Sequence, residues 1–139
     1  MMRLGMTLLL AVITLAVLSC TSEEPPSDRE LISKITNDIE TAVQDHDMMK
    51  IDKHLSAMAK QEGFDANRFL MLSSYGEDYV PELTGWTVRV MDDSARVFFT
   101  LIEAGSLISD STVQSVIRLK KEKDWQIMSY DIKKNLATP

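Results

Sequence analysis

The sequence predicts an α+β fold in which N-terminal helices pack on a curved four-stranded antiparallel meander sheet. Two patterns support this prediction. Between Leu31 and Leu72, apolar residues recur every three or four positions, which is typical of helices with one buried face. From Trp86 onward, apolar and polar residues alternate in four runs joined by short turns, as in antiparallel strands. Helices followed by strands along the chain are the order of an α+β domain.

Capping residues place the predicted helices. Ser27 and Glu30 form a capping box, so the first helix is expected to run from there to about Asp45. A second helix is predicted over residues 47–62, and a short third helix over 65–76. Each of these starts at an aspartate that can cap it and stops at a glycine.

Four strands are predicted over residues 86–90, 96–102, 113–120 and 125–132. Pro81 is expected to break the chain before the first strand, because proline has no amide hydrogen to donate. The second run is apolar on both faces, which predicts a central place in the sheet.

Length and composition restrict the class of protein. The 139 residues are 45% hydrophobic and 26% charged, which favours one folded domain, placed at residues 28–135 with a tail at 136–139. The net charge of -6 argues against nucleic acid as a partner, since phosphate binding requires clustered lysine and arginine. The single cysteine excludes an internal disulfide framework and a zinc site built from cysteines.

The N-terminus carries a predicted signal segment. Residues 6–18 are uncharged, and a helix of this length spans about 20 Å, less than the roughly 30 Å of a membrane's hydrocarbon core. The run therefore predicts a cleaved signal peptide over residues 1–19 rather than a membrane-spanning helix. It ends in the letters VLSC, which resemble the lipobox of bacterial lipoprotein signal peptides.

This resemblance implies that Cys20 becomes the mature N-terminus and is the site of lipid attachment. The two acyl chains of a diacylglycerol suffice for stable membrane anchoring. Thr21 follows in place of the aspartate that would retain such a protein in the inner membrane. The outer membrane, facing the periplasm, is therefore the expected location in a Gram-negative cell. Residues 20–27 are polar and proline-containing, and are expected to form a tether.

The rest of the chain also resembles a known family over residues 28–133. The features are the helices, the segments VRVMDDSARVFFTLIEAG and VQSVIRLKKEKDWQIMSYDI, and a charged turn followed by Trp125, Gln126 and Ile127. They are similar to small secreted lipoproteins of the nuclear-transport-factor-2-like superfamily, with its cystatin-like cone. The resemblance implies a strongly curved sheet around the helices and a pocket inside the cone. Enzymes and non-enzymes share this fold, so the fold alone assigns no activity.

Catalytic and metal-binding residues are sparse in the sequence. An acidic, solvated connector explains the histidines and aspartates around the first helix connection better than a metal site does; they are Asp45, His46, Asp47, Asp52 and His54. A turn explains Asp92 and Asp93. Strand parity places Asp131 on the same face as Trp125, but no motif gives it a catalytic role. We therefore predict no metal, no cofactor and no catalytic residue.

Aromatic and aliphatic side chains on the sheet offer two binding surfaces. One set shares the expected inner face and, with the neighbouring Tyr130, forms either a core or an apolar ligand pocket, with core favoured: Trp86, Phe99, Leu101 and Trp125. A second set lies on the opposite face and suggests a homodimer or partner interface: Phe98, Ile102 and Val116. A basic hairpin reads as a solvated strand face or, less favoured, as a contact with anionic lipid: Arg118, Lys120, Lys121 and Lys123.

Together these patterns predict a membrane-tethered lipoprotein of the cell envelope that acts as a non-enzymatic binding or adaptor module for an envelope protein. Two alternatives stay open. One is a carrier of a small apolar ligand in the cone pocket. The other, less favoured, is a small isomerase or dehydratase, which would require an acid–base pair inside that pocket.

Overall fold

The computed structural model describes residues 24–136. The helices, in chain order, are α2 (Asp28–Asp45), α3 (Met48–Asp52), α4 (Ala57–Gln61) and α5 (Ala66–Leu72). The strands are β1 (Pro81–Met91), β2 (Ser94–Glu103), β3 (Ser115–Lys121) and β4 (Trp125–Asp131). The predicted signal peptide and Cys20 lie outside the described residues. Within residues 24–136, no helix combines the length and the apolar character needed to cross a membrane.

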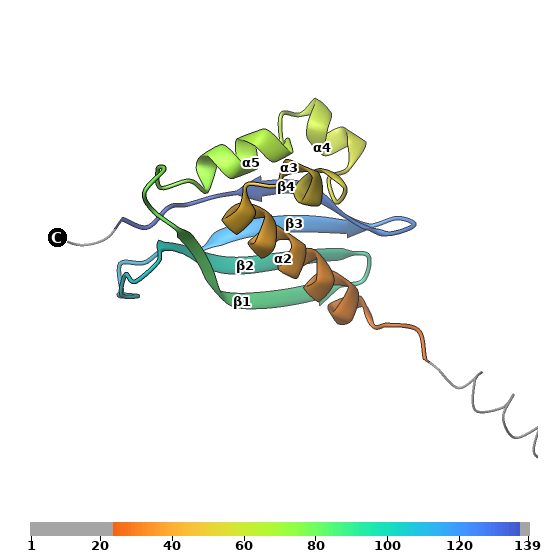
Figure 1. Ribbon diagram of the computed structural model, residues 1–139. Helices are drawn as coiled ribbons and strands as arrows, with labels where there is room; N and C mark the ends of the chain where they lie inside the picture. Colours follow the sequence, from red (N-terminus) through yellow and green to blue (C-terminus); the bar gives the residue numbers. More distant parts are fainter. Residues whose placement is uncertain (1–23, 137–139) are drawn as a thin grey trace, which may run out of the picture.

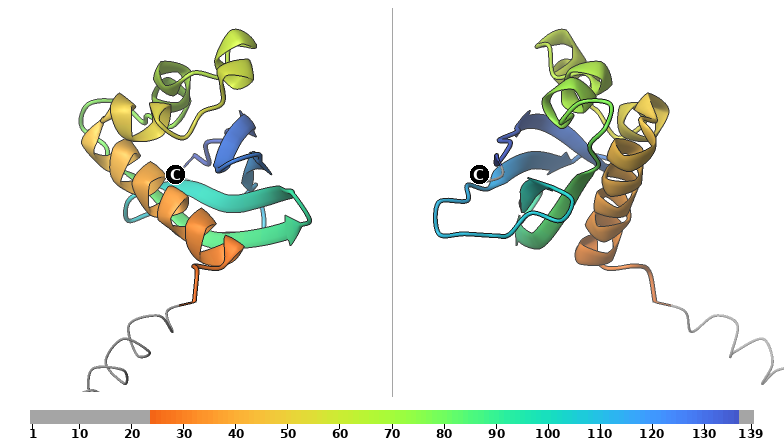
Figure 2. Two further views of the ribbon diagram at one scale, coloured as in Figure 1. Left: turned by 90° about the vertical axis from the view of Figure 1, so that its right-hand side faces the viewer. Right: turned by 60° about the vertical axis from the view of Figure 1, so that its left-hand side comes forward.

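The predicted α+β order is confirmed. The four strands form one antiparallel sheet in the order β1-β2-β3-β4, so β2 has a strand on each side, as its two apolar faces predicted. The sheet is open, with β1 and β4 at its edges, and the helices lie on one side of it (Figures 1 and 2). Helix α2 packs on β1, and α4 packs on β4.

The first helix matches its prediction at both ends. The Ser27 hydroxyl accepts a hydrogen bond from the Glu30 amide at 3.2 Å, which satisfies one of the free amides at the helix start. The helix ends at Asp45, where His46 takes the left-handed conformation with φ of 54°. One face is buried, including Ile32, Ile39 and other residues at helical spacing, so α2 forms one side of the core.

The predicted second helix over 47–62 is wrong as a single element, because the chain forms α3 and α4 with a break between them. At the break, Leu55 pairs with Ile127 of β4 in an isolated parallel bridge. The Ile127 amide donates to the His54 carbonyl at 2.7 Å, and the Ser56 amide donates to the Ile127 carbonyl at 3.0 Å. These bonds to a distant strand replace helical bonds, and Ser56 then caps α4.

The start of the first strand also differs from its prediction. Strand β1 begins at Pro81 itself, five residues before the expected start at Trp86. Proline is tolerated there because it is the first residue of an edge strand. The register shifts between Thr84 and Thr87, where Gly85 takes φ of 67°. This bulge points Trp86 at Phe99, with ring centroids 4.8 Å apart.

The core lies between the helices and the inner face of the sheet. Its largest fully buried apolar side chains come from both layers: Phe69, Phe99, Ile32, Ile39, Ile51, Leu101, Ile117 and Ile127. The core cluster extends from Ile32 to Tyr130 along the chain. One continuous core therefore joins helices and sheet.

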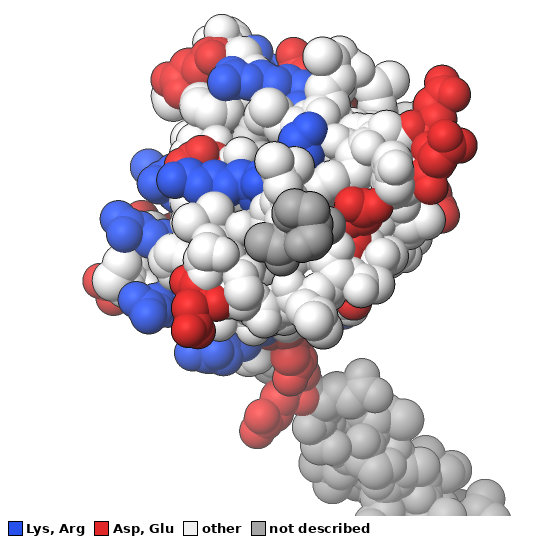
Figure 3. Space-filling view, turned by 90° about the vertical axis from the view of Figure 1, so that its left-hand side faces the viewer, with Lys and Arg blue, Asp and Glu red and all other residues white. Residues whose placement is uncertain are grey.

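The two ends of the sheet differ. At one end lie the β1–β2 turn, the β3–β4 turn and residues 24–27, where the described chain begins (Figure 1). At the other end lie the loop after β2 and the last described residues. Figure 3 looks onto this end, where most of the lysine and arginine side chains lie toward the left of the view and uncharged residues cover much of the rest. Exposed apolar side chains at that end include Tyr79, Val80, Leu107, Ile108 and Leu136.

Candidate functional site

A surface groove lies where the start of α2 meets the β3–β4 hairpin. We call it the α2–hairpin groove, with a volume of about 230 Å³; it is lined by Leu31, Lys34, Ile35, His54, Lys121, Lys123, Asp124 and Trp125. Ile35 and Trp125 are buried and Leu31 is half-buried, so the floor is apolar. The exposed lysines and Asp124 lie at the rim. The groove therefore offers an apolar surface beside three positive charges and one negative charge.

Asp28 fastens α2 to the hairpin beside this groove. Its Oδ1 accepts hydrogen bonds from Lys121 Nζ at 2.7 Å and from Trp125 Nε1 at 3.0 Å. Both donors favour the charged carboxylate, Lys121 most, so they lower the pKa of Asp28 below its usual value. The bond to the indole fixes the orientation of Trp125, which forms part of the groove floor.

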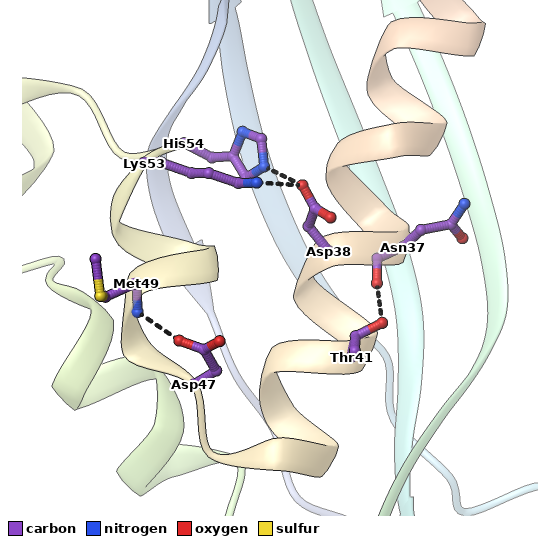
Figure 4. Close-up of polar contacts among 7 residues, drawn as sticks. All are labelled: Asn37, Asp38, Thr41, Asp47, Met49, Lys53 and His54. Atoms are coloured by element: carbon purple, nitrogen blue, oxygen red, sulfur yellow. Dashed lines mark hydrogen bonds and ion pairs between the residues drawn. The ribbon is translucent and has the colours of Figure 1, made fainter.

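His54 forms another wall of the groove, and a contact with Asp38 of α2 fixes the position of its ring. Its Nε2 lies 2.7 Å from Oδ2 of Asp38, and Lys53 Nζ lies 3.1 Å from the same oxygen. Figure 4 shows Asp38 on α2 pointing toward both side chains, which follow α3. The hydrogen bond from His54 is the main cause that lowers the pKa of Asp38. The pair links α2 to the break before α4.

The histidines and aspartates of the connector do not gather into one site. Asp47 caps α3 by accepting from the Met49 amide at 3.1 Å, and His46 lies exposed at the end of α2. Asp52 pairs with Lys60 at 3.1 Å. Across residues 24–136, no group of three His, Cys, Asp or Glu side chains is arranged to hold a metal ion.

The prediction that Asp131 lies on the inner face of the sheet is wrong. The sequence placed it on the inner face with Trp125, but its side chain is exposed. The register between β3 and β4 shifts at Arg118 and Leu119, so β4 carries one extra residue in a bulge. A single extra residue reverses which face the following side chains reach. Tyr130 therefore points inward, and Asp131 lies opposite Val116 on the outer face.

The structure places the five predicted pocket residues in the core region under the helices. Phe99 and Leu101 are fully buried, Trp125 and Tyr130 are buried, and Trp86 is half-buried. Tyr130 packs edge-on against Phe69, with ring centroids 4.9 Å apart. Of the five, Trp125 also lines the α2–hairpin groove.

The three predicted interface residues lie in two environments. Phe98 and Val116 are half-buried and directly opposite each other on the outer face of β2 and β3. The Arg89 guanidinium lies over the Phe98 ring, 5.3 Å from its centre. Ile102 is only 5% exposed and lines a second pocket beneath the loop after β2. It is therefore largely withdrawn from the outer surface.

The Asn135 side chain fixes the loop after β2 by hydrogen bonds to its two ends. The sequence patterns did not indicate this role. The Asn135 amide group donates to the Leu101 and Val113 carbonyls at 2.9 Å each, and its side-chain oxygen accepts from the Val113 amide at 2.8 Å. Because these bonds occupy Val113, β3 begins at Ser115 rather than at the predicted residue 113. The Tyr75 hydroxyl joins the network by donating to the Asn135 carbonyl at 2.8 Å, and burial raises its pKa.

Comparison with known proteins identifies the fold. No protein-family model matches the sequence, and no curated protein matches it. Among solved structures, the chain is similar to a protein of unknown function with a cystatin-like fold from Nostoc punctiforme. The TM-score is 0.52 at 11% sequence identity, covering 84% of this chain and 96% of that chain. At this identity the likeness defines the fold alone: an open, cystatin-like α+β domain.

Proposed function

We propose that this protein is a lipid-tethered, non-enzymatic binding module of the cell envelope, and that its ligand binds in the α2–hairpin groove. The tether is the lipid expected on Cys20, which precedes the described residues. The groove is the observation that carries the binding role, since it combines a buried apolar floor with a rim of lysines.

The chemistry of the groove favours binding over catalysis. Its one lining carboxylate, Asp124, lies in the exposed β3–β4 turn, and its one imidazole, His54, is bonded through Nε2 to Asp38 of α2. The other aspartates considered from the sequence lie elsewhere: Asp131 on the outer face, and Asp92 and Asp93 at the β1–β2 turn. The isomerase or dehydratase considered from the sequence needs an acid–base pair within reach of one reacting atom.

The floor and rim together define the ligand class as an amphiphile with an apolar chain and an anionic group. Leu31, Ile35 and Trp125 offer apolar contact, and Lys34 and Lys123 offer positive charge. The volume of about 230 Å³ is below the roughly 300 Å³ of common small-molecule pockets. The groove therefore holds part of a ligand rather than enclosing it.

Tryptophan fluorescence tests this proposal. The chain from Thr21 to Pro139 contains the whole described core, and its fold is checked first by circular dichroism. Trp86→Phe leaves Trp125 as the only tryptophan. We expect lauric acid to change its emission saturably, and an uncharged alcohol of equal chain length to bind more weakly.

Matched lysine variants locate the site. Lys34→Ala, at the rim, should weaken lauric acid binding several-fold, while Lys60→Ala, on α4 and outside the groove lining, should leave it unchanged. The absence of a saturable change at Trp125, or equal effects of the two variants, would contradict the proposal.

A second candidate function is adaptor contact through the outer face of the sheet. Phe98 and Val116 supply adjacent apolar surface there, with Arg89 over the Phe98 ring. Such a face fits a protein partner or a second copy of this chain. Sedimentation of the chain from Thr21 tests the homodimer: Phe98→Asp should shift any dimer to monomer, while Arg118→Asp, exposed on the same face, should act less. A monomer at all concentrations would leave only a different protein as partner, to be sought with a photo-crosslinker at Val116.

A further inference from the structure

The groove lies at the end of the domain where the chain enters from its tether. Asp28 is the first residue of α2, and its carboxylate contacts both Lys121 and Trp125 of the groove. Cys20 lies eight residues before Asp28, a span of at most about 29 Å for an extended chain. A lipid on Cys20 therefore keeps the α2–hairpin groove close to the membrane surface.

From this position we propose that the groove takes an anionic phospholipid of the membrane to which the chain is tethered. This inference rests on the proposed function and names the ligand of the same site. One acyl chain lies on the apolar floor formed by Leu31, Ile35 and Trp125, and the phosphate lies against the lysine rim. The rest of the lipid stays in the bilayer, which agrees with the small volume of the groove.

Charge complementarity supports an anionic headgroup. Lys34 and Lys123 form no ion pair with any described residue, so their charges are available to a phosphate. Lys121 shares its charge with Asp28 at 2.7 Å, and Asp124 lies at the same rim. The three lysines of the rim are therefore opposed by two carboxylates, those of Asp28 and Asp124. One net positive charge remains beside the apolar floor.

Two lysines of the β3–β4 hairpin distinguish binding in the groove from general attraction of the hairpin to an anionic membrane. Lys123 lines the groove, whereas Lys120 lies exposed in β3 and does not line it. Both lysines belong to the same basic hairpin, so general attraction to an anionic surface would be weakened similarly by the loss of either one. Only Lys123 is placed to contact a lipid in the groove, so the two substitutions separate binding in the groove from general attraction of the basic hairpin.

The test uses the mature lipidated protein in nanodiscs. With Trp86→Phe, the sole tryptophan is Trp125 in the groove floor. Phosphatidylglycerol with brominated acyl chains, at increasing fractions in phosphatidylcholine, is expected to quench Trp125 saturably. The same fractions of brominated phosphatidylcholine should quench it less.

The variants give the quantitative result. Lys123→Ala should raise the half-saturating fraction of phosphatidylglycerol about fivefold, and Lys120→Ala less than about twofold. Native mass spectrometry of the released protein should retain one phosphatidylglycerol. Equal quenching by the two lipids, equal effects of the two variants, or a retained peptide in place of lipid would overturn the inference. If lauric acid binds the soluble chain while Trp125 stays unquenched in nanodiscs, the lipid inference fails and the binding module stands.

Discussion

Tyr130 gives a sharp test of how the sheet and the helices are joined. It lies on β4 with 5% of its surface exposed, and its hydroxyl donates to the Asp65 carbonyl at 2.7 Å. Asp65 caps α5, so this bond links the last strand to the start of a helix. The ring also packs against Phe64 and Phe69, with centroid distances of 5.3 and 4.9 Å.

The perturbation is the ionisation of this hydroxyl at alkaline pH. Burial raises the pKa of Tyr130 to about 12, against about 10 in the unfolded chain. The folded state favours the neutral hydroxyl, so its stabilisation is complete below pH 10 and is lost as the pH rises toward 12. A difference of about two pKa units corresponds to about 2.7 kcal/mol in total, of which about 1.4 kcal/mol is lost by pH 11.

Urea unfolding at about pH 8 and about pH 11 measures this loss, and Tyr130→Phe removes its source. The variant should lose about 1 kcal/mol at pH 8, because the Asp65 carbonyl loses the hydroxyl donor and keeps only the Phe69 amide. Between the two pH values, its free energy of unfolding should fall about 1.4 kcal/mol less than that of the parent. Tyr79→Phe, at an exposed tyrosine, is the control and should follow the parent. Parallel pH dependence of the parent and Tyr130→Phe would refute the reasoning.

Three further outcomes follow from the structure and the sequence. Asn135→Ala removes three hydrogen bonds to Leu101 and Val113 and should lower the free energy of unfolding by about 2 kcal/mol in urea titrations, and an unchanged midpoint would contradict this role. The pKa of Asp38 is lowered by His54, so its stabilisation exists above the unfolded value near 4 and is lost as the pH falls. Asp38→Asn should therefore reduce the loss of unfolding free energy as the pH falls. If that loss is unchanged in the variant, other groups cause it. Cys20→Ala should abolish labelling by a fatty-acid probe and release the protein from membranes, whereas a labelled variant would exclude lipid at this position.

The sequence determined the features whose signals are local. The Ser27 hydroxyl caps the start of α2 by accepting from the Glu30 amide, and both residues lie within one helical turn. Alternation of apolar and polar residues indicated the four strands, and the short turns after β1 and β3 indicated antiparallel pairing. The apolar character of both faces of β2 set its central position. Each of these signals spans at most a few residues, so it can be read without knowing what lies nearby in space.

Tertiary structure decided the features that depend on partners far away in the chain. Leu55 is not helical because it pairs with Ile127 of β4. The residues next to Leu55 in the sequence do not indicate this pairing. Asp131 reaches solvent because a bulge in β4 adds one residue, which reverses the faces that follow.

The candidate site has the same origin. The α2–hairpin groove joins Leu31 and Lys34 to Lys123 and Trp125, which lie about ninety positions later in the sequence. The sequence indicated a basic hairpin and an apolar helix face separately. Only the packing of α2 against the hairpin, fastened by Asp28, places the lysines beside the apolar floor, because contacts between distant segments are set by the shared core and not by local spacing.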